Sequence, residues 1–267
     1  ADIVYGLPYH SYYNNGGFSM IKFIHTSKSF GSTVVHKDIN LTIPKGKITY
    51  IIGPSGTGKS VFIKQIIGLV RPDKGQILVD GESILDMDDA QMLTLRKRFG
   101  LLFQNAALFD SMNVYDNVAF PLREHTNMKE DEIIHVVYEK RRDVGLKDIY
   151  EKMPSELSGG MRKRVGLARA LALNHEVMLY DEFTTGIDPI MTDVVDDLIY
   201  TTQNMRPNRT SVVISHDIKS TLKMADKIAM IYKGTVIEGS VEFFQTTDDP
   251  VVRQFFSGSK DGPIGVY

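Results

Sequence analysis

Short apolar runs of strand length alternate along the chain with longer segments of helical periodicity. KITYIIG at 47–53 predicts a buried strand that ends in glycine, and KSVFIKQIIGLV at 59–70 predicts a helix with one broad apolar face. Later elements of the same alternation are the predicted strands 176–181, 210–215 and 227–232, and the predicted helices that begin at Gly159, lie near 190–204 and span 217–225. This order of elements is typical of a parallel α/β sheet.

The segments outside these blocks have a different character. Residues 84–157 are richer in helix formers and charge, which predicts a helical insertion in the α/β core. Residues 1–19 contain four tyrosines and the run NNGG but show neither the helical nor the strand periodicity of apolar residues. They are interpreted as an appendage, either a flexible leader or a segment foreign to the domain.

A short C-terminal helix is predicted from the spacing of Val251, Val252, Phe255 and Phe256, which share one face. This face either packs on its own domain or docks against a second copy or a companion subunit. The predicted divisions are an N-terminal appendage at 1–19, a first core part at 20–91, a helical subdomain at 92–157, a second core part at 158–240 and a C-terminal extension at 241–267.

Composition narrows the class of protein. The chain has 267 residues, of which 42% are hydrophobic, enough for one large domain or a core with a subdomain. A net charge of −2 argues against a general nucleic-acid binder, so no nucleic-acid partner is expected. The chain contains no cysteine, which excludes disulfides and thiolate metal sites. It has no apolar run of about 18 residues, so no membrane span is predicted.

GPSGTGKS at 53–60 matches the pattern of a phosphate-binding loop and lies between a predicted strand and a predicted helix. Glycines allow the backbone to turn its N–H groups toward phosphate oxygens, and the helix N-terminus favours an anion. The alternative is a glycine-rich connection with an exposed lysine, which the context disfavours. The predicted nucleotide-binding residues are Gly53, Pro54, Ser55, Gly56, Thr57, Gly58, Lys59 and Ser60, with Lys59 directed to the β- and γ-phosphates and Ser60 to Mg²⁺.

Two adjacent carboxylates, Asp181 and Glu182, end the apolar strand VMLY. Carboxylates at the end of a buried strand are costly unless a cation or a reaction needs them. A strand parallel to that of the phosphate loop would bring Asp181 to the same sheet edge, where it serves Mg²⁺ through water. Glu182 is then free to orient or deprotonate the attacking water. A pair of helix-capping acids is the alternative.

LSGGM at 157–161 predicts a second anion site at a helix N-terminus. Ser158 suits an N-cap position, while Gly159 and Gly160 leave the first-turn N–H groups open. Taken alone, the stretch also fits a capped helix with a basic face. Two phosphate-binding features in one chain make sense if two copies share ATP, so that Ser158, Gly159 and Gly160 close over the partner's γ-phosphate.

These motifs, in this order and spacing, resemble an ABC-type ATPase subunit over about residues 20–240. The resemblance implies a P-loop NTPase core of the RecA-like type, an ABC-type helical subdomain, ATP and Mg²⁺ as ligands, and a homodimer. It also assigns roles to four further positions. Phe30 would stack on adenine, Gln104 would contact Mg²⁺ and sense the transporter, Asp188 would communicate across the dimer, and His216 would contact the γ-phosphate.

Within this family, the chain most resembles the ATPase of Mla/Mce-type lipid transporters. The similarity is carried by the segments 101–126, 153–173 and 248–263. Met161 fits that group, whereas Phe183 stands where ABC ATPases usually have proline. The resemblance implies a translocase at the cytoplasmic face of the inner (plasma) membrane, peripheral through a permease that contacts the region from Gln104 to Thr126. It further implies a small cytoplasmic companion and an Mce-domain substrate-binding protein.

Three other functions compete with this interpretation. One is the ATPase of an ABC transporter with a different cargo. Another is a soluble ABC ATPase that acts on nucleic acid or ribosomes, but such proteins usually carry inserts or a second ATPase half, and this chain has one phosphate loop. The last is a P-loop kinase, which would leave LSGGM and His216 without a role.

Overall fold

The larger sheet of the computed structural model confirms the predicted parallel α/β core. The structure describes residues 19–265 except 148 and 207, so the predicted appendage lies almost wholly outside the described residues. In spatial order the sheet contains β10 (Thr235–Gly239), β9 (Lys227–Tyr232), β3 (Ile48–Ile52), β8 (Thr210–Ile214), β7 (Val177–Asp181) and β6 (Phe99–Leu102). Its strands from β9 to β6 run parallel, and β10 pairs with β9 antiparallel.

A smaller antiparallel sheet covers one face of the core. It consists of β2 (Thr33–Pro44), β1 (Ser19–Phe30), β4 (Lys74–Val79) and β5 (Glu82–Ser83). Side chains from this sheet, from α1 (Lys59–Ile66) and from α2 (Asp89–Arg96) share one buried cluster with Ile51, Leu179 and Ile214 of the larger sheet. Alternate residues of the same strands, such as Tyr50 and Tyr180, join a second cluster on the other face.

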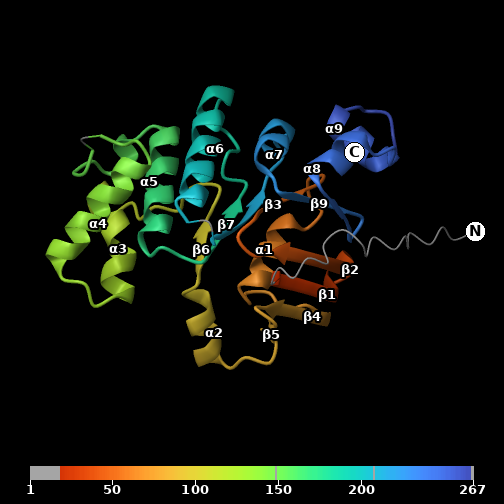
Figure 1. Ribbon diagram of the computed structural model, residues 1–267, viewed down its shortest axis with the longest axis horizontal. Coiled ribbons are helices and arrows are strands. Elements are labelled where there is room, and N and C mark those ends of the chain that lie inside the picture. Colours follow the sequence, from red (N-terminus) through yellow and green to blue (C-terminus); the bar gives the residue numbers. More distant parts are fainter. Residues whose placement is uncertain (1–18, 148, 207, 266–267) are drawn as a thin grey trace, which may run out of the picture.

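The second face is covered by helices, and three of them gather at one end of the molecule (Figure 1). They are α3 (Val114–His125), α4 (Glu130–Asp143) and α5 (Gly159–Ala172), with a short 3-10 turn at Pro154–Glu156 before α5. The remaining helices are α6 (Pro189–Asn204), α7 (Ile218–Met224), α8 (Val241–Thr246) and α9 (Pro250–Ser257). None of the helices in the described part of the chain has the length and apolarity that a bilayer span requires.

Two features differ from the divisions predicted along the chain. Strand β6 lies within 92–157, the range expected to be the helical subdomain, yet it pairs with β7 in the core sheet. Helix α5, expected in the second core part, packs against α3 and α4 (Figure 1). A strand of four residues has too short a pattern to separate from a buried helix segment, and tertiary packing decided both placements.

Helix α1 ends four residues earlier than the predicted limit at Val70. Gly68 adopts φ 67°, and the N–H of Leu69 donates to the carbonyl of Lys64 at 2.8 Å. A glycine in the left-handed conformation closes a helix in this way because it lacks a Cβ. The apolar residues Leu69 and Val70 therefore follow the helix instead of extending it.

The C-terminal helix packs on its own chain, the first of the two predicted alternatives. Val252 is fully buried, and the ring of Phe256 stacks on Phe244 with centroids 5.6 Å apart. Val251 and Phe255 are half-buried against the same cluster. Residues 241–257 thus form a small layer beside β9 and β10, at the opposite end from α4 (Figure 1).

Candidate functional site

The loop 53–58 follows β3 and leads directly into α1, as the phosphate-binding pattern predicts. Gly53, Gly56 and Gly58 have φ values of 141°, 77° and 92°. A Cβ on Gly53 would lie 2.3 Å from the carbonyl oxygen of Ile231, so both backbone conformation and close approach require glycine there. Thr57 closes the loop by donating its hydroxyl to the carbonyl of Pro54 at 2.9 Å.

Lys59, the first residue of α1, has a buried side chain that turns back into this loop. Its Nζ donates to the carbonyls of Gly53 and Pro54, both at 3.0 Å, and lies 4.0 Å from Glu182 Oε1. Burial lowers the pKa of Lys59, and the carboxylates of Glu182 and Asp181 oppose that shift. The ammonium therefore stands between the loop and the two carboxylates that end β7.

Asp181 meets the phosphate loop as the sheet geometry predicts. The hydroxyl of Ser60 donates to Asp181 Oδ1 at 3.1 Å. Burial raises the pKa of Asp181, while the hydrogen bond from Ser60 opposes the rise. The Ser60 hydroxyl and the Asp181 carboxylate are both oxygen ligands of the kind that Mg²⁺ prefers, and a cation beside Asp181 would offset the cost of burying its charge.

Glu182 and His216 meet across the ends of two adjacent strands. The Nε2 of His216 lies 2.7 Å from Oε1 of Glu182. Glu182 adopts φ 50°, a conformation that costs a residue with a Cβ about 1–2 kcal/mol. Its N–H donates to the carbonyl of Ile214 at 3.1 Å, so β8 holds the strained backbone in place.

Gln104 follows β6 at the same edge of the sheet, because Leu102 pairs with Tyr180 in parallel register. Its side chain is exposed, and among the described residues no hydrogen bond joins it to Ser60 or Asp181. The loop beyond it is anchored by Arg169, which donates to the carbonyls of Ala106 and Ala107 at 2.9 and 2.8 Å. Both alanines have positive φ, so this anchor stabilises a strained turn.

Phe30 lies at the tip of the smaller sheet with 49% of its surface exposed, a suitable state for stacking on a base. The Nζ of Lys28 lies 5.3 Å from the centroid of its ring. The hairpin that carries Phe30 reaches the phosphate loop through Val35 and His36, which would contact a Cβ on Gly58. The structure thus brings the end of β1 close to the loop.

His36 supports the phosphate loop from behind and was not foreseen from the sequence. It is fully buried, with Nε2 at 3.2 Å from the carbonyl of Gly58 and Nδ1 at 3.1 Å from Gln65 Oε1. Burial lowers the pKa of His36, although both polar contacts oppose the shift. A lone histidine in an alternating strand gives no signal of this contact.

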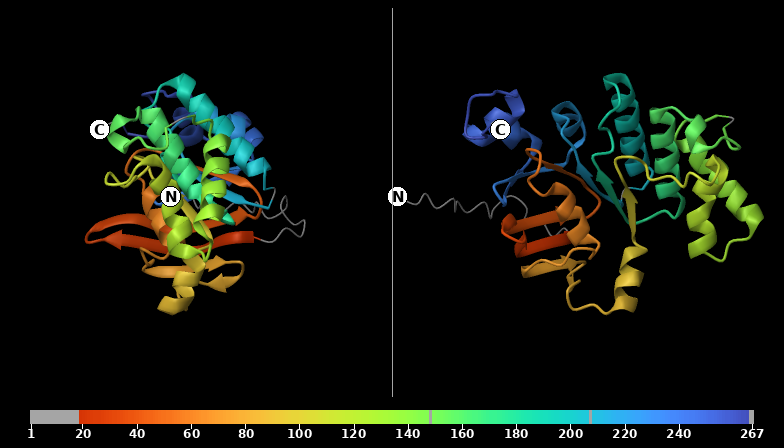
Figure 2. Two further views of the ribbon diagram at one scale, coloured as in Figure 1. Left: turned by 90° about the vertical axis from the view of Figure 1, so that its left-hand side faces the viewer. Right: turned by 180° about the vertical axis from the view of Figure 1, so that it is seen from behind.

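The predicted trans residues lie apart from the phosphate loop of their own chain. Ser158 caps α5 by accepting a hydrogen bond from the N–H of Met161 at 3.2 Å, and it is exposed together with Gly159. Asp188 is an exposed N-cap of α6 and accepts from the N–H of Met191 at 2.9 Å. Figure 1 and the right-hand view of Figure 2 show α5 and α1 on different sides of β7, so a single chain keeps these residues apart from Lys59.

The chain is similar to known ATP-binding proteins of membrane transport systems. Residues 36–185 match the ABC transporter family. The chain is 45% identical to the intermembrane phospholipid transport system ATP-binding protein MlaF of Escherichia coli over 235 residues, covering 88% of this chain and 87% of that protein. It is 47% identical to the probable ribonucleotide transport ATP-binding protein Mkl of Mycobacterium tuberculosis, over 90% of this chain and 67% of that protein.

Solved structures with the same fold include CbiO1 of Clostridium perfringens, part of an ABC transporter complex, with TM-score 0.78 and 29% identity over 85% of this chain and 91% of that one. A dimeric ATP-binding cassette in a post-hydrolysis state with ADP and Pi gives TM-score 0.75 and 28% identity over 83% of this chain and 99% of that one. The predicted P-loop NTPase fold is therefore confirmed. This chain belongs to the ABC transporter family, as an ATP-binding subunit.

Proposed function

We propose that this chain is the ATP-hydrolysing motor of a translocase that moves phospholipids or related lipids. The observation that carries the catalytic part is the convergence of Lys59, Ser60, Asp181, Glu182 and His216 at one edge of the sheet. Lipid as cargo is supported by the identity with MlaF, which extends over nearly its whole length. The mycobacterial relatives, named for ribonucleotide transport, are matched over a smaller share of their length.

The loop 53–60 would hold the phosphates of ATP. Its glycines free the backbone N–H groups, and Lys59 would exchange its two loop carbonyls for β- and γ-phosphate oxygens. The exposed ring of Phe30 would stack on adenine. Ser60 and Asp181 would hold Mg²⁺, and Gln104 would join them when its exposed side chain turns inward. Bound there, Mg²⁺ would neutralise charge that develops on the phosphate oxygens.

Hydrolysis would use Glu182 as the base. Water attacks the γ-phosphorus, the bond to the β-phosphate oxygen breaks, and ADP and inorganic phosphate are released. Glu182 would accept the proton of the attacking water, while His216 holds its carboxylate and contacts the γ-phosphate. Positioned donors of this kind contribute a few kcal/mol each to stabilisation of the transition state.

A second copy of the chain would complete the site. Ser158, Gly159 and Gly160 lie at an open helix N-terminus, where N–H groups favour an anion. Because one chain keeps them apart from its own Lys59, the partner would supply them over the γ-phosphate, with Asp188 at the interface between the copies. A related cassette has a dimeric structure bound to ADP and Pi, which supports a dimer for this chain.

The permease would dock on a groove of about 680 Å³ beside the Gln104 loop. Phe103 and Phe109 in its wall are 43% and 41% exposed, and Phe120 and Pro121 are among its other apolar lining residues. An exposed apolar groove of this kind fits a partner segment. This contact would hold the motor at the cytoplasmic face of the inner membrane. A small cytoplasmic companion and an Mce-domain substrate-binding protein are proposed as further partners.

The test is purification of the chain with its complex from the native membrane. We expect a multi-span permease in the preparation, bound phospholipid by mass spectrometry, and ATP hydrolysis that EDTA abolishes. Co-purification of ribosomes or nucleic acid instead of a permease would contradict the motor function. A permease with no lipid, but with ribonucleotide bound, would contradict the proposed cargo alone.

A further inference from the structure

Lys163, on the second turn of α5, is a buried lysine held by main-chain carbonyls. Its side chain is 7% exposed. Its Nζ donates to the carbonyl of Phe183 and, at 2.7 Å, to that of Thr185. Among residues 19–265 without 148 and 207, no carboxylate forms an ion pair with it. Burying an ammonium without a counter-charge lowers stability, so a functional role would explain why a lysine occupies this position.

Both carbonyl acceptors belong to the segment directly after Glu182. The strained backbone of Glu182, at φ 50°, is fixed on one side by its N–H bond to Ile214. On the other side, the N–H of Thr185 donates to the carbonyl of Glu182 at 3.1 Å. The Lys163 ammonium adds two bonds to the same turn. A left-handed residue persists only where its surroundings over-determine it, and Lys163 supplies part of that constraint.

Phe183 shields this contact from water. Its ring is 2% exposed, and its centroid lies 5.4 Å from Lys163 Nζ. An ammonium over an aromatic face is attracted electrostatically, more strongly where water is excluded. The ring, the ammonium and the two carbonyls therefore form one packed unit between α5 and the end of β7.

We infer that Lys163 is a positioning residue that aims the carboxylate of Glu182 at the attacking water. This inference rests on the proposed ATP hydrolysis. Because Lys163 is five residues beyond Ser158 on the same helix, it also ties the helix N-terminus offered to the partner's nucleotide to the reaction centre of its own chain. A shift of α5 against the sheet would move the turn at 183–185 and rotate Glu182.

The test compares ATP hydrolysis and ATP binding in the complete complex. Lys163→Met keeps the apolar stem but removes all donors, so we expect kcat to fall at least tenfold while KM and ATP affinity stay within about twofold of wild type. Lys163→Arg should recover much of kcat, because a guanidinium can donate to both carbonyls. Should Lys163→Met fail to fold, Lys163→Gln carries the test, with an intermediate kcat from its single amide donor group.

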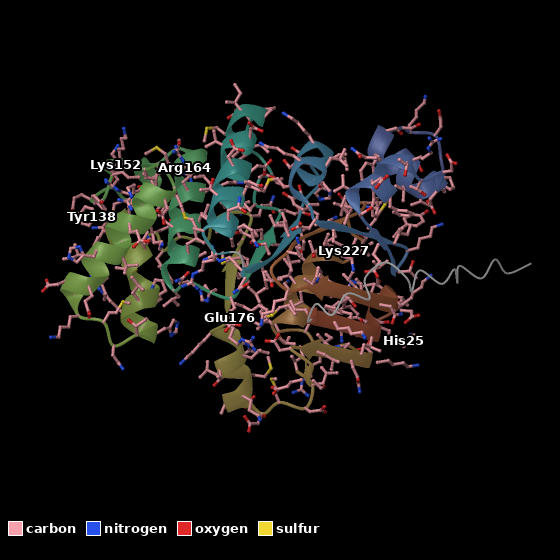
Figure 3. All side chains as sticks on the ribbon, in the orientation of Figure 1. His25, Tyr138, Lys152, Arg164, Glu176 and Lys227 are labelled. Atoms are coloured by element: carbon pink, nitrogen blue, oxygen red, sulfur yellow. The ribbon has the colours of Figure 1, made fainter. Side chains whose placement is uncertain are left out.

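Lys227→Met is the control for losing a buried lysine outside the site. Lys227, on β9, donates to the Thr42 carbonyl at 2.7 Å and forms an ion pair with Glu238 at 2.8 Å. It lies far from Arg164, the neighbour of Lys163 (Figure 3). We expect it to lower thermal stability without changing kcat. In a Glu182→Gln background, Lys163→Met should cause no further loss of hydrolysis, since the group it positions is already absent.

The outcomes separate the two proposals. Wild-type kcat in Lys163→Met would overturn the positioning role. So would parallel loss of ATP affinity and kcat, or an equal loss in the Glu182→Gln background, because these indicate general destabilisation. A wild-type complex that does not hydrolyse Mg-ATP would instead overturn the proposed function itself.

Discussion

The carboxylate of Glu182 lies 2.7 Å from the imidazole of His216, although the two residues are 34 positions apart in the sequence. The parallel pairing of β7 and β8 produces this contact, since Asp181 pairs with Ile214 and the chain continues past both at one edge. Lys59 approaches the same carboxylate to 4.0 Å from the neighbouring loop. A candidate base is thus held between an imidazole and an ammonium.

Glu182→Gln should bind ATP and dimerise but scarcely turn over. The amide keeps the size of the side chain but cannot accept the proton of the attacking water. We expect kcat to fall by about 10²–10⁴-fold, the usual contribution of a general base. Steady-state hydrolysis with nucleotide binding and size-exclusion chromatography would measure this. Hydrolysis at the wild-type rate would remove Glu182 from the role of base.

Ser158→Arg should block hydrolysis in the partner's site rather than in its own. The arginine would fill the space over the helix N-terminus that a second copy's γ-phosphate is proposed to occupy. Mixed dimers with one variant chain should therefore lose one of two sites, whereas the Lys59 of the variant chain stays functional. Two fully active sites in such a mixed dimer would show that the sites are not shared.

Phe183→Pro should destabilise the fold but leave turnover within tenfold of wild type. The ring is buried in the main cluster, and its removal should cost about 3 kcal/mol of unfolding free energy. Phe183→Leu, which retains apolar volume, should cost less and serves as the control in urea unfolding. A tenfold rise in hydrolysis by the proline variant, about 1.4 kcal/mol of barrier, would mean that phenylalanine slows the native site.

Asp196→Asn should stabilise the protein more at pH 8 than at pH 5. Burial raises the pKa of Asp196 to about 6, although the hydrogen bond from Ser220 opposes the rise. The folded state then binds the proton more tightly than the unfolded state. Stability is therefore lost as pH rises from about 4 to about 6, and the loss persists at higher pH.

Asparagine at this position keeps an acceptor for Ser220 but carries no charge. The gain should reach at most about 3 kcal/mol above pH 7 and shrink toward acid pH. Urea midpoints of both proteins at pH 5 and pH 8 would measure it. An equal gain at the two pH values would show that the charge of Asp196 is not what destabilises the fold.

The amino-acid sequence by itself determines the phosphate loop, because its cradle is built from consecutive residues 53–60 whose glycines set the backbone. It also determines the parallel core, because buried strands and amphipathic helices alternate along the chain. The positions of Asp181 and His216 follow from these two facts, because parallel strands end at one edge. Local patterns of this kind need no knowledge of distant packing.

Tertiary structure alone decided the contacts that hold the candidate base in place. In the sequence, Lys163 is one of several basic residues of a predicted helix, and its contact with the Thr185 carbonyl forms only because α5 packs beside the end of β7. His36 is an isolated histidine in the sequence, and it contacts the Gly58 carbonyl only because β2 packs behind the phosphate loop. The four residues of β6 likewise become a core strand through pairing with β7. Such contacts join residues far apart in the chain, and their free energy depends on how whole elements pack, which periodicity does not encode.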